Sequence, residues 1–322
     1  MSESPGFTSP AMSLPVLLVL IPLSDARLSA LESDFDVILA PDAARRAQAV
    51  AEHGARVRLV LTNGSTGLTA AEIDAMPGLT LASALGAGYE NIDVAHARAR
   101  GIVLVNGAGT NDQCVADHAF GLLLAIVRGL PQLDRACRDG VWRTSLRPPP
   151  NVSGKRLGLL GLGNIGRRIA RRGLGFDMTI GYHARSPRQD VDYRYFDDAR
   201  ALAAWSDYLV VATPGGGDTR HLVDAAVLDA LGPQGFLVNI ARGSVVDTAA
   251  LADALRDARI AGAGLDVYES EPRPPAELLA FPNVLLTPHV AGWSPEAIEA
   301  SMRQFIDNAR RHLAGEPVLT PI

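Results

Sequence analysis

Short apolar runs alternate with amphipathic segments through the first third of the chain. The apolar runs predict strands at 16–21, 37–39, 57–61, 79–82 and 103–105, and the amphipathic segments predict helices at 28–33, 43–52, 70–76 and 94–100. Strands that alternate with helices form right-handed βαβ units, which build a parallel sheet. This third of the chain therefore predicts a small doubly wound domain.

A second series of the same kind begins at Lys155. Strands are expected at 157–160, 178–182, 208–212, 236–240, 263–267 and 284–286, and helices at 165–174, 220–231 and 248–256, the last with Asp247 as its N-cap. Six strands with intervening helices are typical of the nucleotide-binding Rossmann fold. A final helix over 295–313 is expected to pack back on the first domain.

The segment that joins the two series is apolar from residue 115 to 130 and ends at Pro131. It predicts a helix that is apolar on most faces and buried between domains or subunits. A polar helix follows at 134–140, then a connector with prolines at 148–150. We thus expect an α/β protein of two doubly wound parallel-sheet domains around a cleft. Residues 14–112 with 295–322 form a flavodoxin-like substrate domain, 113–294 form the Rossmann domain, and the polar segment 1–13 is disordered.

The composition narrows the class of protein. The chain has 322 residues, 48% of them hydrophobic, and a net charge of −5, so no basic excess indicates nucleic acid or an anionic membrane as partner. The apolar stretch 14–23 is too short to cross a bilayer and lacks a basic flank, so a first strand is favoured over a signal peptide. Cys114 and Cys137 form neither a disulfide framework nor a metal-ligand pattern. We expect a cytoplasmic protein without a metal.

A glycine-rich turn follows the first strand of the second series. Gly161, Gly163 and Gly166 have the spacing of a dinucleotide-binding turn. The first glycine allows the tight turn, the second lets backbone approach a pyrophosphate, and the third lets helix and strand pack closely. The following helix N-terminus favours an anion. The alternative is an ordinary turn between a strand and a helix.

The loop after the next strand bears on which dinucleotide binds. An NAD site has an acidic residue roughly 20 residues beyond the glycines, where it binds the ribose hydroxyls. Here the loop contains Arg185, Ser186 and Arg188, and no acid comes before Asp190. Arginine offers a planar fork of donors to a phosphate. The loop therefore favours NADP over NAD, and the alternative is a solvated basic loop that binds NAD through backbone groups.

Three later strands are each followed by a side chain that could bind a substrate or transfer a proton. Arg242 follows the fourth strand, Glu271 lies in the loop after the fifth, and His289 follows the sixth. Ligands of open α/β sheets bind at the carboxyl ends of strands. An arginine there can hold a carboxylate through two bonds, and a histidine can donate or take a proton. Singly, Arg242 could be a surface ion pair and His289 a structural residue. The remaining histidines are interpreted as surface or packing residues: His53, His96, His118, His183, His221 and His312.

Seven stretches, in order, make the chain resemble the D-isomer-specific 2-hydroxyacid dehydrogenases over nearly its whole length. They are LGAGYENID from Leu85, RGIVLVN from Arg100, VADHA from Val115, GLGNIG from Gly161, NIARGSVVD from Asn239, GLDVYESEP from Gly264 and TPHVAG from Thr287. The basic loop makes the resemblance closest to the NADP-preferring glyoxylate/hydroxypyruvate reductase branch.

The resemblance implies a role for each matching residue. His289 is like the family's general acid, Glu271 is like its carboxylate partner, and Arg242 is like the residue that binds the substrate carboxylate. Ala87 and Gly88 match the loop that donates N–H groups to the substrate. Cofactor contacts are implied for Asn164, Ile165, Thr213, Pro214, Ala241, Asp266 and Gly292, of which Asp266 would contact the nicotinamide carboxamide.

The implied reaction is reversible hydride transfer between NADP(H) and a small 2-keto acid or D-2-hydroxy acid, in a homodimer. A binding or regulatory protein that senses the dinucleotide is one alternative. Formate or phosphonate oxidation is another, which Glu271 disfavours because formate enzymes of this group resemble a version with glutamine there. Two positions depart from the family pattern: Asp117 replaces a usual glutamate, and Trp293 replaces a serine or threonine. Trp293 could line the substrate pocket or a dimer interface.

Overall fold

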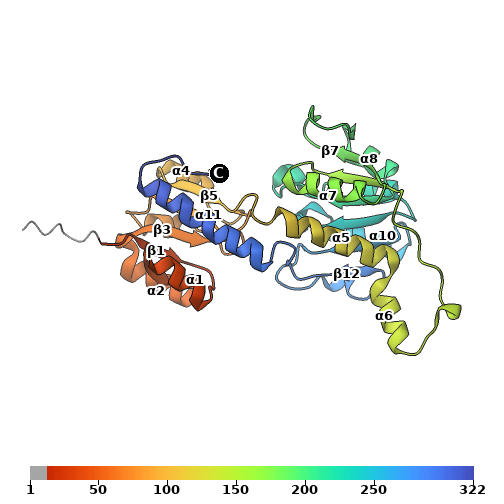
Figure 1. Ribbon diagram of the computed structural model, residues 1–322, viewed down its shortest axis with the longest axis horizontal. Helices are drawn as coiled ribbons and strands as arrows, with labels where there is room; N and C mark the ends of the chain where they lie inside the picture. Colours follow the sequence, from red (N-terminus) through yellow and green to blue (C-terminus); the bar gives the residue numbers. More distant parts are fainter. Residues whose placement is uncertain (1–12) are drawn as a thin grey trace, which may run out of the picture. The chain divides into compact units, whose positions relative to one another are not determined.

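The computed structural model describes residues 13–322 (Figure 1). The chain divides into two compact units. Unit 1 contains the described residues up to Thr110 together with Ile298–Ile322, and unit 2 contains Asn111–Ala297. The expected disordered segment 1–13 lies outside the described residues except for Ser13.

Unit 1 is built on a five-stranded parallel sheet with the order β2-β1-β3-β4-β5. This is the flavodoxin-like order that the first apolar series predicts. The strands are β1 (Val16–Val19), β2 (Asp36–Leu39), β3 (Val57–Thr62), β4 (Leu81–Ala84) and β5 (Val103–Asn106). Its helices are α1 (Asp25–Glu32), α2 (Ala43–His53), α3 (Ala70–Asp74), α4 (Val94–Ala99) and α11 (Pro295–Leu313), and η1 (Gly54–Arg56) is a 3₁₀ turn.

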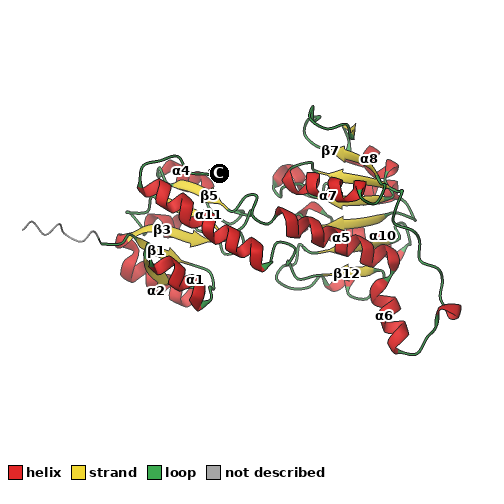
Figure 2. Ribbon diagram, viewed as in Figure 1, coloured by secondary structure: helices red, strands yellow, loops and turns green. Residues whose placement is uncertain are grey.

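Helices cover both faces of this sheet (Figure 2), so the central strands β1, β3 and β4 are buried at every position except Arg58. Leu18 and Leu20 face a core shared with α2, α3 and α4, whereas Leu17 and Val19 face a core shared with α1 and α11. The predicted return of the last helix to the first domain is confirmed, because Phe305 of α11 is buried in that second core.

Unit 2 carries a seven-stranded parallel sheet with the order β12-β11-β10-β9-β6-β7-β8. Its strands are β6 (Arg156–Leu160), β7 (Thr179–His183), β8 (Arg194–Phe196), β9 (Tyr208–Val211), β10 (Phe236–Asn239), β11 (Gly262–Leu265) and β12 (Val284–Leu286). The direction of strand addition reverses between β6 and β9, and ligands of doubly wound folds bind at such a reversal.

The helices of unit 2 form two layers on the sheet. One face packs against α5 (Asp112–Arg128) and α7 (Asn164–Leu174), and the other against α8 (Ala199–Trp205), α9 (Ala225–Leu231) and α10 (Thr248–Arg256). The chain also contains α6 (Leu130–Arg138) and the 3₁₀ turns η2 (Arg143–Ser145), η3 (Gly217–Thr219), η4 (Gly243–Val245) and η5 (Ala276–Leu278). The buried residues of α5 thus pack on the sheet of their own unit, whereas the expectation was a helix buried between domains or subunits.

The fold class is confirmed, but four local predictions were wrong. Strand β8 and helix α8 were missed, because three and seven residues are too few to show a period. The helix predicted over 220–231 begins only at Ala225, where Asp224 caps it by accepting a hydrogen bond from the N–H of Val227. Helix α5 ends at Gly129, which adopts a left-handed φ of 60°, and Pro131 lies in the first turn of α6 instead of ending α5.

Within residues 13–322 no single helix is both long and apolar enough to cross a membrane. Helices α5 and α6 together reach that length, but they bend by 58° at Gly129.

Candidate active site

The parallel register of unit 2 brings several loops to one edge of the sheet. Asn239 at the end of β10 pairs with Val211 of β9 and Leu265 of β11, and Leu265 pairs with Leu286 of β12. The residues that follow these strands therefore emerge side by side. They are the segments after Val211, Asn239, Leu265 and Leu286, which carry all three catalytic candidates and five of the predicted cofactor residues.

The glycine turn after β6 has the geometry that its motif predicts. Gly161 has a φ of 98°, and a Cβ there would lie 2.7 Å from the carbonyl oxygen of Ala212. A Cβ on Gly166 would lie 2.3 Å from the carbonyl oxygen of Gly161, so helix and turn pack closely. Gly163 is the N-cap of α7, and a Cβ there would meet open space. The first N–H groups of α7 thus have no capping side chain, which fits a pyrophosphate.

The basic loop after β7 is exposed at Arg185, Ser186 and Arg188. The N–H of Arg188 donates to the hydroxyl of the buried Tyr182 at 2.7 Å, which anchors the loop. The first acid beyond it, Asp190, is paired with Arg167 of α7 at 2.8 Å. The hydrogen bond from Arg167 lowers the pKa of Asp190. This carboxylate is therefore held by α7.

Four further predicted cofactor residues follow the strand ends. Thr213 and Pro214 follow β9 directly beside the glycine turn, since a Cβ on Gly161 would lie 2.9 Å from the nitrogen of Thr213. Ala241 is buried after β10, and its N–H donates to the side chain of Asn239 at 3.0 Å. Gly292 follows the loop of β12, packed against the side chain of Asn111.

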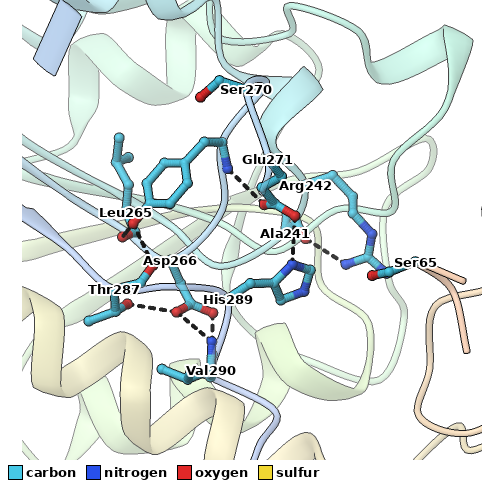
Figure 3. A network of polar contacts seen from close by, with 12 residues as sticks. Ser65, Ala241, Arg242, Leu265, Asp266, Ser270, Glu271, Thr287, His289 and Val290 are labelled. Carbon is cyan, nitrogen blue, oxygen red and sulfur yellow. Dashed lines mark hydrogen bonds and ion pairs between the residues drawn. The ribbon is translucent and has the colours of Figure 1, made fainter. Parts of the chain in front are cut away.

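Arg242 extends from the end of β10 along the backbone of Gly215, whose missing side chain leaves room for the arginine stem. Its Nη1 donates to the carbonyl of Ala241 at 2.6 Å. The positive charge of Arg242 contributes to lowering the pKa values of both Glu271 and His289, so the guanidinium lies within electrostatic range of both (Figure 3).

Glu271 and His289 form a hydrogen-bonded pair. The Oε2 of Glu271 lies 2.9 Å from the Nδ1 of His289, and its Oε1 accepts the N–H of Tyr268 at 2.9 Å. The hydrogen bond that His289 donates to Glu271 raises the pKa of His289 and outweighs burial, which lowers it. Burial alone would raise the pKa of Glu271, but the bonds from His289 and Tyr268 lower it. The pair therefore favours an ionised carboxylate beside an imidazolium.

The loop that carries His289 is held by Asp266, whose side chain is 1% exposed. Its carboxylate accepts the hydroxyl of Thr287 at 2.6 Å and the N–H groups of Val290 and Ala291 at 2.9 and 2.8 Å (Figure 3). The N–H of His289 donates to the carbonyl of Asp266 at 2.8 Å. These bonds keep His289 at a φ of 54°, a conformation that is uncommon for a residue with a Cβ.

His118 of α5 joins this network, a role that sequence analysis missed. Its Nε2 lies 2.9 Å from the Oγ1 of Thr287. Because the single hydroxyl proton of Thr287 goes to Asp266, its oxygen accepts from His118, and the Nε2 of His118 therefore carries a proton. Tyr268, which also donates to the carbonyl of Thr287, has its pKa raised to about 12 by burial and neighbouring carboxylates. His221 is the second missed histidine, since it contacts Glu269 at 2.8 Å.

The predicted substrate loop with Ala87 and Gly88 follows β4 in unit 1. The carbonyl of Ala87 accepts the side-chain amide of Asn106 at 2.7 Å, and the N–H of Gly86 donates to the buried hydroxyl of Ser301 on α11 at 3.0 Å. The loop is thus tied to both β5 and α11. Gly88 also packs against Gly64.

The two departures from the family pattern are placed as follows. The side chain of Asp117 on α5 is bound by Arg172 of α7, through its Nε at 2.8 Å. Trp293 is 72% exposed. Cys114 and Cys137 are free thiols, and no group of three or more potential metal ligands occurs among residues 13–322.

A Rossmann sheet with a phosphate-binding turn, beside an arginine and a carboxylate–imidazole pair at the strand ends, defines a nicotinamide-dinucleotide-dependent dehydrogenase. The family model for the NAD-binding domain of D-isomer specific 2-hydroxyacid dehydrogenases matches residues 120–291. The chain is 37% identical over 307 residues to glyoxylate/hydroxypyruvate reductase A of Arabidopsis thaliana, which covers 95% of this chain and 98% of that protein. It is 38% identical to hydroxyphenylpyruvate reductase of Plectranthus scutellarioides, over 83% of this chain and 85% of that one.

Solved structures of proteins from the same family are also similar to this chain. The NADPH-dependent glyoxylate/hydroxypyruvate reductase of Sinorhizobium meliloti, in complex with NADP and malonate, has a TM-score of 0.88 at 39% identity and covers 96% of this chain and 97% of its own. The 2-hydroxyacid dehydrogenase of Ketogulonicigenium vulgare has a TM-score of 0.89 at 38% identity and covers 97% and 99%. The chain belongs to the D-isomer specific 2-hydroxyacid dehydrogenase family. It is an oxidoreductase that interconverts 2-keto acids and 2-hydroxy acids with a nicotinamide dinucleotide.

Proposed function

We propose that the protein is an NADPH-preferring reductase of small 2-keto acids, with glyoxylate, hydroxypyruvate or a bulkier analogue as substrate. The observation that carries this proposal is the hydrogen-bonded Glu271–His289 pair within electrostatic range of Arg242. The two reductases of glyoxylate and hydroxypyruvate described above, one of them solved with NADP, support the substrate class.

His289 is the proposed general acid. Its Nδ1 is occupied by Glu271, so the proton for the keto oxygen leaves from Nε2. Glu271 keeps the imidazole protonated before the transfer and stabilises its orientation. When bound, the dinucleotide supplies the hydride for the keto carbon. In the reverse direction, neutral His289 accepts the hydroxyl proton.

Arg242 is the proposed ligand of the substrate carboxylate, since its planar guanidinium can donate two parallel hydrogen bonds to it. We assign substrate binding through the backbone N–H groups of Ala87 and Gly88 to unit 1, and the dinucleotide to unit 2. The proposed dinucleotide contacts of unit 2 are Gly161, Gly163, Asn164, Ile165, Gly166, Thr213, Pro214, Ala241, Asp266 and Gly292.

The preference for NADPH is proposed from the loop after β7. Arg185, Ser186 and Arg188 are exposed donors, and Asp190, which would repel a 2′-phosphate, is paired with Arg167. A guanidinium pair is suited to a phosphate dianion.

A panel of 2-keto acids assayed with NADPH and NADH side by side tests the proposal. We expect the highest kcat/KM with a short 2-keto acid and NADPH. Absence of NADPH oxidation with every member of the panel would favour the alternative of a dinucleotide-sensing regulatory protein. Equal use of both cofactors would refute the NADP assignment alone.

We further propose a cytoplasmic homodimer. Helix α6 buries none of its nine residues, and Leu130, Val141 and Trp142 of this region are exposed. A second copy of the chain would remove these apolar side chains from water. Sedimentation equilibrium is expected to give twice the mass of the 322-residue chain, and a monomer at micromolar concentration would contradict this.

A further inference from the structure

A second polar cluster lies beside the Glu271–His289 pair, centred on Glu269. Its Oε1 lies 2.8 Å from the Nε2 of His221 and 3.7 Å from Arg220. Its Oε2 accepts the hydroxyl and the N–H of Thr248 at 2.8 and 3.2 Å. Asp247 lies 3.6 Å from the other ring nitrogen of His221. One carboxylate thus joins the loops that follow β9, β10 and β11.

The partners of Glu269 are themselves held firmly. His221 has a φ of 51°, and its N–H donates to the carbonyl of Ser244 at 2.8 Å. Thr248 is the first residue of α10, which is capped by Asp247. Four described non-glycine residues have positive φ, and two of them are the histidines bonded to Glu269 and Glu271. A conformation that L-residues rarely adopt is kept where the surrounding contacts impose it.

The bonded carboxylate is ionised in this setting. Burial by itself would raise the pKa of Glu269, but the hydrogen bonds from His221 and Thr248 outweigh burial and lower it. The cluster therefore anchors a charged side chain by at least three donors from two loops, each stronger than a neutral hydrogen bond.

The anchored loop is the one that carries Glu271. Glu269 and Glu271 are two residues apart, and the N–H of Tyr268 donates to the Oε1 of Glu271. The backbone of the same loop packs closely against Gly243, where a Cβ would come within 1.9 Å of the carbonyl carbon of Tyr268. Gly243 directly follows Arg242. A shift of the loop at Glu269 would therefore change the position of the Glu271 carboxylate and press on the segment that presents Arg242.

We propose that Glu269 is a positioning residue for proton transfer: bound by His221 and Thr248, it fixes the 268–271 loop so that Glu271 meets His289. This inference rests on the proposed role of the Glu271–His289 pair. Within residues 13–322, Glu269 forms no hydrogen bond with Glu271 or His289. Its effect on turnover therefore passes through the position of Glu271.

The first test compares Glu269→Ala, Glu269→Gln and the exposed control Glu277→Ala. We expect Glu269→Ala to lower kcat for 2-keto acid reduction by up to about 30-fold, no more than the loss of the Glu271 charge itself, with little change in KM for the dinucleotide. The alkaline limb of the pH profile should move to lower pH, because His289 loses its well-placed carboxylate. Glu269→Gln keeps an acceptor for Thr248 and should recover most of the activity, and Glu277→Ala should match the parent.

A double-mutant cycle separates positioning from plain loss of stability. In a Glu271→Gln background, Glu269→Ala should cost less than about twofold in kcat, because the pathway through Glu271 is already removed. Losses that multiply, or a fall in Tm without a change in kcat and pH profile, would overturn the proposal.

The proposal has a readout independent of turnover. NMR titration of labelled histidine, with the His289 signal assigned by His289→Gln, should show a lower pKa for His289 in Glu269→Ala than in the parent. An unchanged titration overturns the positioning role even if the protein proves inactive toward every keto acid. Inactive parent protein with a shifted titration would instead refute the proposed function and leave the positioning role supported.

Discussion

Replacement of Glu271 by glutamine removes the charge that faces His289 and retains the shape of the side chain. The glutamine oxygen can still accept the N–H of Tyr268, which leaves the amide NH₂ toward the Nδ1 of His289. A protonated imidazole is a donor at that nitrogen, so two donors would face each other. The variant therefore disfavours the imidazolium, the form that reduction requires.

The size of the effect follows from the exposure of the pair. A hydrogen bond to a charged group contributes about 1.5–3 kcal/mol. Because the side chains of His289 and Glu271 are 43% and 31% exposed, solvent screening reduces this contribution to about 1–2 kcal/mol. At roughly 1.4 kcal/mol for each factor of ten, kcat/KM for reduction at neutral pH should fall about 5- to 30-fold.

The pKa of His289 decides in which direction the pH profile of the variant moves. Glu271 raises the pKa of His289, so the parent keeps its imidazolium to higher pH than the variant does. The alkaline limb of reduction should therefore move to lower pH in Glu271→Gln, and the two proteins should converge in acid, where both imidazoles are protonated. NADPH oxidation followed by absorbance across this range measures both, with Glu277→Gln as the matched control. An alkaline limb at the same pH in parent and variant would refute the reasoning.

Three further predictions follow from other contacts. Replacing Arg185 and Arg188 together by alanine should lower the ratio of kcat/KM with NADPH to that with NADH by at least about tenfold, since two charge-assisted phosphate contacts are lost; an unmoved ratio would contradict the phosphate assignment. Asp266→Asn places an amide donor against a buried N–H or hydroxyl donor and should cost about 1–3 kcal/mol in urea unfolding, with a fall in kcat; unchanged stability would refute the clamp. Glu72→Ala removes the α3 capping box and the ion pair with Arg46, whose side chains are 21% and 15% exposed, and should cost about 2–4 kcal/mol. Hydrogen bonds from Arg46 and Thr69 lower the pKa of Glu72 against the effect of burial. The stabilisation by Glu72 is therefore present above the unfolded-state pKa and is lost as pH falls through the folded-state pKa. A difference in unfolding free energy between parent and variant that persists in acid would contradict this.

Residue patterns alone were sufficient for much of the fold. Strands buried on both faces are mostly apolar, so the central strands of both sheets were predicted within about two residues of their observed ends. Two elements, the edge strand β8 and helix α8, escaped prediction because they are short. β8 has only three residues, of which Arg194 is exposed, and α8 has fewer than two full turns of apolar period. His221 lies in a segment with helical spacing, but it has a positive φ, and the helix begins only after the Asp224 N-cap.

The catalytic candidates also divide into features that are local in the chain and contacts that only the fold creates. Arg242, Glu271 and His289 were identified from their places after strands and from family motifs, both of which are local features of the chain. The polar networks around them were not predictable in this way. His118 and Thr287 are 169 residues apart, and His221 and Glu269 are 48 apart, so their hydrogen bonds exist only because parallel register aligns the strand ends with α5 and with each other.

Local patterns along the chain were enough to predict the two α/β domains, the glycine turn after β6 and the residue types at the strand ends. These depend on periodicity and backbone permissiveness, which neighbouring residues decide. Three contacts could be seen only in the folded chain: Asp266 holds the His289 loop, Arg167 pairs with Asp190, and Glu269 joins three loops. Each of these depends on distances across the sheet of a few ångströms, which no spacing along the chain specifies.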